Sequence, residues 1–258
     1  MLCRDIMKVI EATYPKHAAL EWDNVGLLVG RMDKEVKSIY VALDATDEVI
    51  EDAISCGADM LLTHHPLLFS PLKKITDEDF IGSRFVKLLQ HDISYYAMHT
   101  NYDVLGMAQL SGAILGLNDM KVLEVTDDET KEGIGRVGLL KFEMSLQECC
   151  ELVKERFHLE TVKVFGNLKE KVQRVAISPG SGKHMSEFAL AEGAQVLVTG
   201  DIDHHEGLDA MERGLFIIDA GHYGLEHIFM EDVAEFIKKK MFDVRVVTAE
   251  NVHPFHVI

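Results

Sequence analysis

Hydrophobic residues recur along the chain with two periods, one typical of buried strands and one typical of amphipathic helices. Short apolar runs in the first half predict strands over residues 38–43, 58–63 and 93–98. Helical spacing of apolar positions predicts the helices that separate and flank them, over residues 5–13, 46–57, 80–90 and 104–117. Because short buried strands alternate with helices, we expect a parallel sheet with helices on both faces.

The second half of the chain repeats this plan. Its predicted strands cover residues 173–178, 194–199 and 215–219, and its predicted helices cover residues 183–192 and 203–213. The repeat is also visible in single residues, since GADMLLTHH from Gly57 to His65 aligns with GAQVLVTGD from Gly193 to Asp201 at an offset of 136 positions. A helix from about residue 225 to 240 and a strand over residues 243–248 are predicted to end the chain.

The predicted fold class is α/β, with two related α/β halves whose mainly parallel sheets surround an internal pseudo-two-fold axis. Between the halves, a strand, a helix opened by a capping box from Ser145 to Glu148, and a second strand predict a small βαβ segment that bridges them. We expect a first α/β half over residues 1–128, the bridge over 129–170 and a second α/β half over 171–258.

Composition and charge narrow the class of protein. Hydrophobic residues make up 47% of the chain and charged residues 27%, which is typical of a folded globular protein. The 26 Lys and Arg residues against 43 Asp and Glu residues give a formal net charge of −17, which makes nucleic acid an unexpected partner. The segment from Met1 to Tyr14 mixes charged with apolar residues, so we expect neither a signal peptide nor a membrane partner. The four Cys residues have no CxxC spacing, which favours a cytoplasmic location.

The chain has 13 His residues, and several of them lie at the predicted strand ends. His64 and His65 follow one strand, His99 follows the next, and His222 follows the strand at residues 215–219. Ligands gather at the carboxyl ends of parallel strands, so these positions indicate a site. Asp103 and Glu226 each lie four residues after one of these histidines, a spacing that places both members of a pair on one helical face.

Up to four imidazoles and two carboxylates are the ligands of a two-metal site, in which the ions lie roughly 3.5–4 Å apart. Nitrogen and oxygen ligands without sulfur suit Fe, Mn, Zn, Co or Ni, and do not distinguish between them. A rival set follows the repeated strand, and spacing does not rank it below the first. It consists of Asp201, Asp203, His204, His205 and Glu206. The alternative for His204 and His205 is a place on the first turn of a helix, where they orient ligands or contact substrate.

Four residues near the start of the chain form a polar, aromatic and flexible cluster, namely Trp22, Asp23, Asn24 and Gly26. A lone Trp either packs into a core or, in a loop beside a cleft, stacks on a flat ring. Asp44 ends a predicted strand, and it either reaches the pocket or caps a helix together with Thr46. A turn at Pro179 to Lys183 either binds an anion through its backbone or is an ordinary turn.

Five motifs resemble, in order, those of the NIF-three-like family, whose members carry names such as GTP cyclohydrolase I type 2 homologue. They span nearly the whole chain: WDNVGLLVG at Trp22–Gly30, LLTHHPLLF at Leu61–Phe69, HTNYD at His99–Asp103, TGDIDHH at Thr199–His205 and DAGHYGLE at Asp219–Glu226. The chain is similar to the short form that lacks a large inserted domain. The resemblance also implies a ring-shaped homohexamer.

The resemblance implies which residues hold two divalent metal ions per subunit. The ligands that it implies are His64, His65, Asp103, His222 and Glu226. It also implies that His99 is not a metal ligand and instead has a catalytic role in proton transfer. We expect the remaining candidates to contact substrate or to orient ligands: Asp23, Asn24, Asp44, Asp201, His204 and His205. Leu225 stands where the family usually has Thr, so a hydroxyl beside the ions is missing.

The function that follows is a dinuclear metal-dependent hydrolase with a small-molecule substrate. Two ions would lower the pKa of a bridging water, and His99 would shuttle a proton. Family resemblance implies GTP or a related nucleotide or heterocycle as the substrate. The alternatives are a metal-binding regulatory or interaction protein without turnover, and a ring-shaped DNA-binding protein, for which the sequence offers no basic patch.

Overall fold

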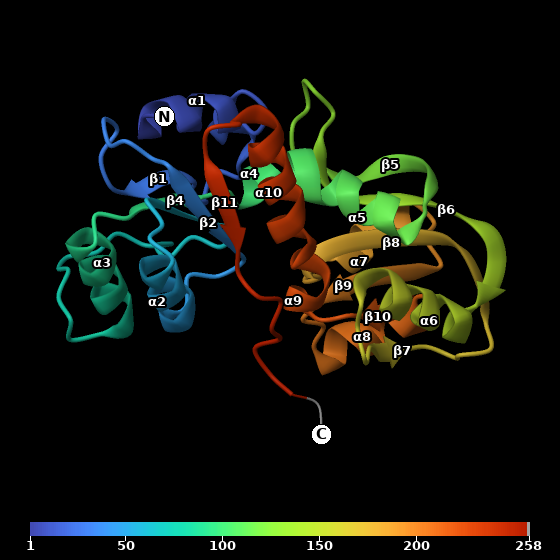
Figure 1. Cartoon of the computed structure of the whole chain (residues 1–258). Helices are drawn as coiled ribbons and strands as arrows, with labels where there is room; N and C mark the ends of the chain where they lie inside the picture. Colours follow the sequence, from blue (N-terminus) through green and yellow to red (C-terminus); the bar gives the residue numbers. More distant parts are fainter. Residues whose placement is uncertain (257–258) are drawn as a thin grey trace. The chain divides into compact units, whose positions relative to one another are not determined.

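The computed structural model describes residues 1–256, which divide into two compact units (Figure 1). The first unit contains Met1–Tyr102 and Phe229–Asn251, and the second contains Asp103–Ile228 and Val252–His256. Each unit is built on one sheet covered by helices.

The first unit contains a five-stranded sheet. In spatial order its strands are β1 (Gly26–Val29), β4 (Ser94–Ala97), β3 (Met60–Thr63), β2 (Ser38–Ala42) and β11 (Arg245–Thr248). All neighbours pair in parallel except β1, which runs antiparallel to β4. The strands β2, β3 and β4 are buried along their whole length, which is why they appear in the sequence as continuous apolar runs.

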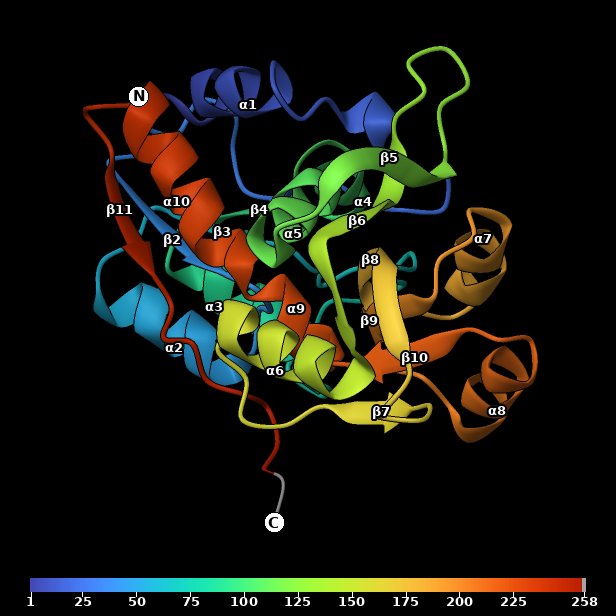
Figure 2. The ribbon, with the colours of Figure 1, turned by 90° about the vertical axis from the view of Figure 1, so that its right-hand side faces the viewer.

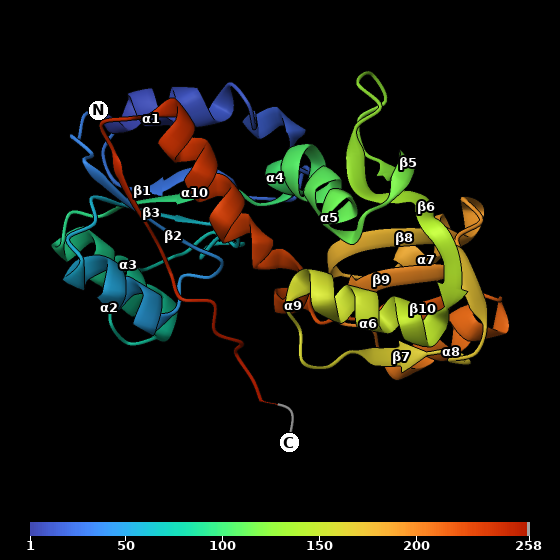
Figure 3. The ribbon, with the colours of Figure 1, turned by 45° about the vertical axis from the view of Figure 1, so that its right-hand side comes forward.

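Helices cover both faces of this sheet. They are α1 (Cys3–Glu11), the 3₁₀ turn η1 (Lys16–Ala18), α2 (Asp47–Ser55), α3 (Phe80–Gln90), α4 (Thr100–Tyr102) and α10 (Ile228–Lys240). Tyr40, Leu61 and Tyr95 are paired neighbours across three strands and form a core with the buried side chains of α2 and α3. Figure 3 shows α1 and α10 on the opposite side of the sheet from α2 and α3.

The second unit contains a six-stranded sheet. In spatial order its strands are β5 (Asn118–Val125), β6 (Gly133–Ser145), β8 (Lys171–Ser181), β9 (Val196–Gly200), β10 (Phe216–Asp219) and β7 (Lys163–Phe165). The central strands β8, β9 and β10 are parallel, and the other three pair antiparallel. The aligned repeat falls on β3 and β9, which are the middle strands of the two parallel cores.

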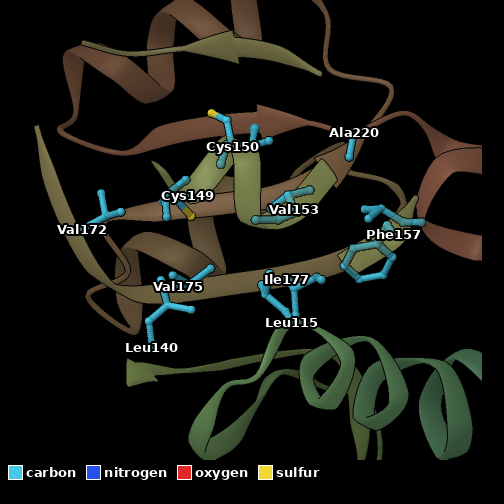
Figure 4. Packing of buried hydrophobic residues seen from close by; sticks show 14 of the residues in the cluster. Leu115, Leu140, Cys149, Cys150, Val153, Phe157, Val172, Val175, Ile177 and Ala220 are labelled. Atoms are coloured by element: carbon cyan, nitrogen blue, oxygen red, sulfur yellow. The ribbon is translucent and has the colours of Figure 1, made fainter. Parts of the chain in front are cut away.

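Two hydrophobic clusters hold the helices of the second unit to its sheet. These helices are the π-helical turn η2 (Asp103–Met107), α5 (Ala108–Leu115), α6 (Leu146–Phe157), α7 (Met185–Ala191), α8 (His204–Glu212) and α9 (His222–Glu226). Figure 2 shows α6 on one side of the sheet and α7 and α8 on the other. Cys149, Cys150, Val153 and Phe157 of α6 pack on β8, as the close view in Figure 4 shows. Burial raises the pKa of the Cys149 thiol to about 12, so this cysteine is a core residue without nucleophilic reactivity.

The predicted α/β class with two sheets and mostly parallel strand pairs is confirmed. The units depart from the expected boundaries, because η2, α5 and β5 pack against β6 and β8 and so belong to the second unit. Residues 129–170 also differ from the expected bridge. They contribute β6, α6 and β7 to the six-stranded sheet, where β6 lies between β5 and β8 and β7 lies at the far edge. None of the helices in the described part of the chain combines the length and hydropathy of a membrane-spanning segment.

Candidate metal centre

Three histidines converge at the carboxyl ends of two neighbouring strands in the first unit. His64 and His65 follow β3, and His99 follows β4. The ring centroid of His64 lies 4.8 Å from that of His65 and 5.2 Å from that of His99, and the centroids of His65 and His99 are 5.5 Å apart. Each ring offers a nitrogen within 4.8 Å of the others. The structure therefore brings the rings of His64, His65 and His99 together at these strand ends.

The turn after β3 explains how two adjacent histidines reach one cluster. Within a regular strand their side chains would point to opposite faces of the sheet. Here Thr63 Oγ1 donates to the carbonyl oxygen of His65 at 2.8 Å, and the Tyr95 hydroxyl, 2.9 Å from the same oxygen, also accepts from Leu67 N. These bonds curl the chain as soon as β3 ends, so both imidazoles turn to the same side.

An oxygen holds the Nδ1 atom of each ring. His64 Nδ1 lies 2.8 Å from the carbonyl oxygen of Met98, His65 Nδ1 lies 2.8 Å from Asp44 Oδ1, and His99 Nδ1 lies 2.9 Å from Asp23 Oδ1. A carbonyl or carboxylate oxygen accepts, so Nδ1 carries the proton and the lone pair is on Nε2. This pattern of acceptors behind the rings is typical of histidines that bind metal.

Asp23 joins His99 to the start of α4. Its side chain is fully buried and also accepts hydrogen bonds from the backbone N–H and the hydroxyl of Thr100. Burial alone would raise the pKa of this carboxyl, but the hydrogen bonds and charge of His99 and Thr100 lower it to about 2. Asp23 is thus a carboxylate that orients His99. Asn24 serves the same loop, since its side-chain amide donates to the carbonyl oxygen of Leu68 at 2.7 Å.

The second unit carries a histidine between two carboxylates. His222 follows β10, its Nδ1 lies 2.7 Å from Asp201 Oδ2, and its Nε2 lies 3.1 Å from Oε2 of the buried Glu226. Burial alone would lower the pKa of His222, but the bonds and charges of Glu226 and Asp201 raise it to about 9. The same carboxylates that stabilise the imidazolium also favour a metal cation, and ligation requires loss of that proton.

Gly180 makes room for this carboxylate. It lies in β8 with φ +79°, and a Cβ at this position would be 2.5 Å from Glu226 Oε1. Only glycine combines that backbone angle with that close approach. Gly180 and the Met98 carbonyl are the contributors that sequence reasoning missed. The turn motif at Pro179–Lys183 was the one available signal for Gly180, and a backbone carbonyl has none.

Of the remaining candidates, Asp103 is grouped with Glu226, because a carboxylate oxygen of each lies within 4.8 Å of the other. Asp103 is the half-buried first residue of η2. His204 and His205 lie exposed on the first turn of α8, where Asp203 accepts from the N–H of Glu206 as an N-cap. His205 lines a groove of about 510 Å³ beside α7 and α8. Within residues 1–256, none of the groups of His, Cys, Asp and Glu with metal-ligand geometry includes a member of the rival set, and Asp201 instead holds His222.

The donors fit divalent metal ions. The clusters offer imidazole nitrogens and carboxylate oxygens, whereas the four cysteines are free thiols that belong to neither cluster. Such nitrogen and oxygen donors suit first-row transition metals. The structure therefore contains groups of His, Asp and Glu side chains that could hold a metal ion.

Comparison with known proteins gives a consistent picture along the whole chain. A family model described as Duf34/NIF3 (NGG1p interacting factor 3) matches residues 1–254. The GTP cyclohydrolase 1 type 2 homolog of Clostridium perfringens (strain 13 / Type A) is 36% identical over 262 residues, which cover 100% of both chains. Among solved structures, the Bacillus cereus protein related to NIF3 has a TM-score of 0.93 at 27% identity and covers 100% of this chain and 99% of that one. Reduced HcgD from Methanocaldococcus jannaschii has a TM-score of 0.84 at 33% identity, with 96% and 97% covered.

Proposed function

Because the chain belongs to the Duf34/NIF3 family, we propose that it is a dinuclear metal-dependent hydrolase acting on GTP or a related nucleotide or nitrogen heterocycle. The relatives' shared name, GTP cyclohydrolase 1 type 2 homolog, supports this substrate class. The observation that carries the proposal is the set of three converging imidazoles whose Nδ1 atoms are all held by oxygens.

We assign metal binding to five residues on the basis of the sequence motifs and the chemistry of their donor atoms. They are His64, His65, Asp103, His222 and Glu226. The proposed cofactor is two divalent ions per subunit, chosen from Fe, Mn, Zn, Co and Ni. When bound, such ions act as Lewis acids and lower the pKa of water.

The protein's own residues then orient the ligands and move a proton. Asp44 holds the ring of His65, and Asp201 holds the ring of His222. His99 is the proposed acid–base residue, because its Nε2 can take up a proton while Asp23 stabilises the resulting imidazolium through Nδ1. This division of roles keeps His99 out of the ligand set.

A turnover screen tests the proposal. Metal-reconstituted protein is assayed against GTP, other nucleotides, phosphoesters and cyclic amides. The Glu226→Gln variant should lose at least a hundredfold in rate on any substrate that is turned over, since it removes a charged ligand. Glu231→Gln is the matched control, because Glu231 is exposed in the first turn of α10. If wild type and Glu226→Gln were equally inert or equally active across the panel, the catalytic proposal would be abandoned in favour of metal binding without turnover.

A further inference from the structure

Two exposed aromatic rings lie edge-on to the ring of His99. The Trp22 ring centroid is 5.8 Å from that of His99 at an interplanar angle of 73°, and the Phe69 centroid is also 5.8 Å from it, at 79°. Trp22 is 61% exposed and Phe69 is 54% exposed. Both rings therefore touch the proposed acid–base residue while keeping much of their apolar surface in water.

A hydrogen bond ties together the two loops that carry these rings. Asn24 Nδ2 donates to the carbonyl oxygen of Leu68 at 2.7 Å, which joins the loop of Trp22 to the loop of Phe69. The loop of Trp22 is also anchored through the buried carboxylate of Asp23, which accepts from Asn24 N and from Thr100 N. The rings are thus held in place before any ligand binds, which lowers the entropic cost of binding.

We infer that Trp22 and Phe69 bind a planar heteroaromatic ring by stacking, and that His99 Nε2 accepts a hydrogen bond from the polar edge of that ring and so orients it. The inference rests on the proposed function and names the part of the substrate that is recognised. Every heteroaromatic ring has a π-face that stacks on an aromatic side chain. Polar ring edges also need a partner, and His99 is the polar group that both aromatic rings contact.

The charge of the protein favours recognition through the base rather than through phosphates. The formal net charge is −17, and the carboxylates of Asp23 and Asp44 hold the histidines of this cluster. An uncharged ring bound by stacking is not repelled by this field, whereas a phosphate group is. We therefore expect most of the selectivity of Trp22 and Phe69 to be for the ring itself.

Trp22 is the sole Trp of the chain, so its fluorescence reports binding directly. The protein is titrated with guanosine, with and without added metal ion, and with cyclohexanol as a saturated ring that lacks π-electrons. We expect saturable quenching by guanosine and none by cyclohexanol. The same response to both compounds, or none to guanosine, overturns the inference.

Substitutions of Trp22 and Phe69 test whether these two rings bind the ligand. By calorimetry, Trp22→Ala and Phe69→Ala should each raise the dissociation constant of guanosine about tenfold, in line with stacking on a single side chain. Trp22→Phe should restore most of the affinity, and Phe242→Ala, which removes an 88% exposed ring between α10 and β11, should leave it unchanged. Unchanged affinity in both Ala variants overturns the inference.

The test separates this inference from the proposed function. Glu226→Gln should still bind guanosine even though it lacks a metal ligand. Guanosine binding by the wild-type protein without turnover of any compound in the panel would support the stacking site and contradict the hydrolase proposal. If a substrate is found, Trp22→Ala should raise KM about tenfold with little change in kcat. Turnover with an unaltered KM in Trp22→Ala and Phe69→Ala would retain the hydrolase and discard the stacking site.

Discussion

The chemistry of single residues in this protein depends on which ring nitrogen of each histidine is held. In the first unit, the Nδ1 atoms of His64, His65 and His99 are hydrogen-bonded to a backbone carbonyl and to two carboxylates, respectively. The three rings therefore act through Nε2. His204 and His205 have the same residue type and the same adjacency as His64 and His65, yet they contact each other on an exposed helical turn. Adjacency alone does not distinguish the two pairs.

Metal content should separate these two pairs. His65→Ala removes a ring that is held by Asp44 and should lower the bound metal by at least one ion per chain, as measured by elemental analysis after dialysis. His204→Ala changes an exposed residue and should keep the wild-type content. Loss of metal in His204→Ala together with full content in His65→Ala would show that the ligands lie at α8 instead.

Asp23 should contribute to stability in a pH-dependent way. Its pKa in the folded protein is about 2, below the ordinary 3.8, so its stabilising effect is complete above the ordinary value and disappears as pH falls through about 2. The shift corresponds to about 2 kcal/mol at neutral pH. Urea unfolding of Asp23→Asn should show this loss at pH 7 and a shrinking difference between pH 4 and pH 2.

Asp33→Asn provides the comparison for Asp23, since the Asp33 side chain is 72% exposed. We expect its unfolding free energy to stay within about 0.5 kcal/mol of wild type at every pH. A loss in Asp23→Asn that did not vary with pH would mean that the carboxylate charge is unimportant and that only its hydrogen bonds stabilise the loop.

At the scale of elements, the parallel strands were predictable, including the edge strand β11, whereas the antiparallel edge strands β1 and β5 were not. The strands β2, β3 and β4 are fully buried, and so they appear as uninterrupted apolar runs. In contrast, β5 is mostly exposed or half-buried, and two of the four residues of β1 are half-buried, so neither strand appears as a continuous buried run. The helix predicted over residues 104–117 begins instead as the π-helical turn η2, and the α-helix α5 starts only at Ala108.

The end of β9 should tolerate no side chain. A Cβ at Gly200 would lie 2.5 Å from His222 N, 2.7 Å from Gly221 C and 2.8 Å from Gly180 O, all of them backbone atoms. Gly200→Ala should therefore lower the unfolding free energy by about 1–3 kcal/mol and reduce metal binding by moving His222. Chemical denaturation and elemental analysis measure the two effects.

Gly224→Ala, in the same region, is a suitable comparison for Gly200→Ala. Its added Cβ would meet side-chain carbons of Leu159 at 3.1 and 3.5 Å, which can shift slightly. We expect a smaller stability change than for Gly200→Ala. Similar losses in both variants would argue against a special role for the backbone contact between Gly200 and His222.

At the scale of the whole molecule, the acidic charge has to be reconciled with assembly. We propose a homohexamer on the basis of the sequence resemblance, although each chain carries a formal charge of −17. Like-charged subunits repel one another, and salt screens that repulsion over about 10 Å at 0.1 M ionic strength. Light scattering should therefore give six times the mass of one chain, with dissociation favoured by low salt. A monomeric mass at all salt concentrations would contradict the hexamer.

Most of the strands and helices, the two parallel cores and the histidines at the strand ends were determined by the sequence itself, because burial and hydrogen bonding impose local periods on it. The family followed from five short motifs. Which oxygen holds which ring was decided only by the tertiary structure, since Asp23 reaches His99 across 76 positions and the Met98 carbonyl reaches His64 across 34. The same holds for Trp22 and Phe69, whose common contact is His99. Such pairings depend on which distant segments of the chain the fold brings together, and a local pattern of residues carries no information about that.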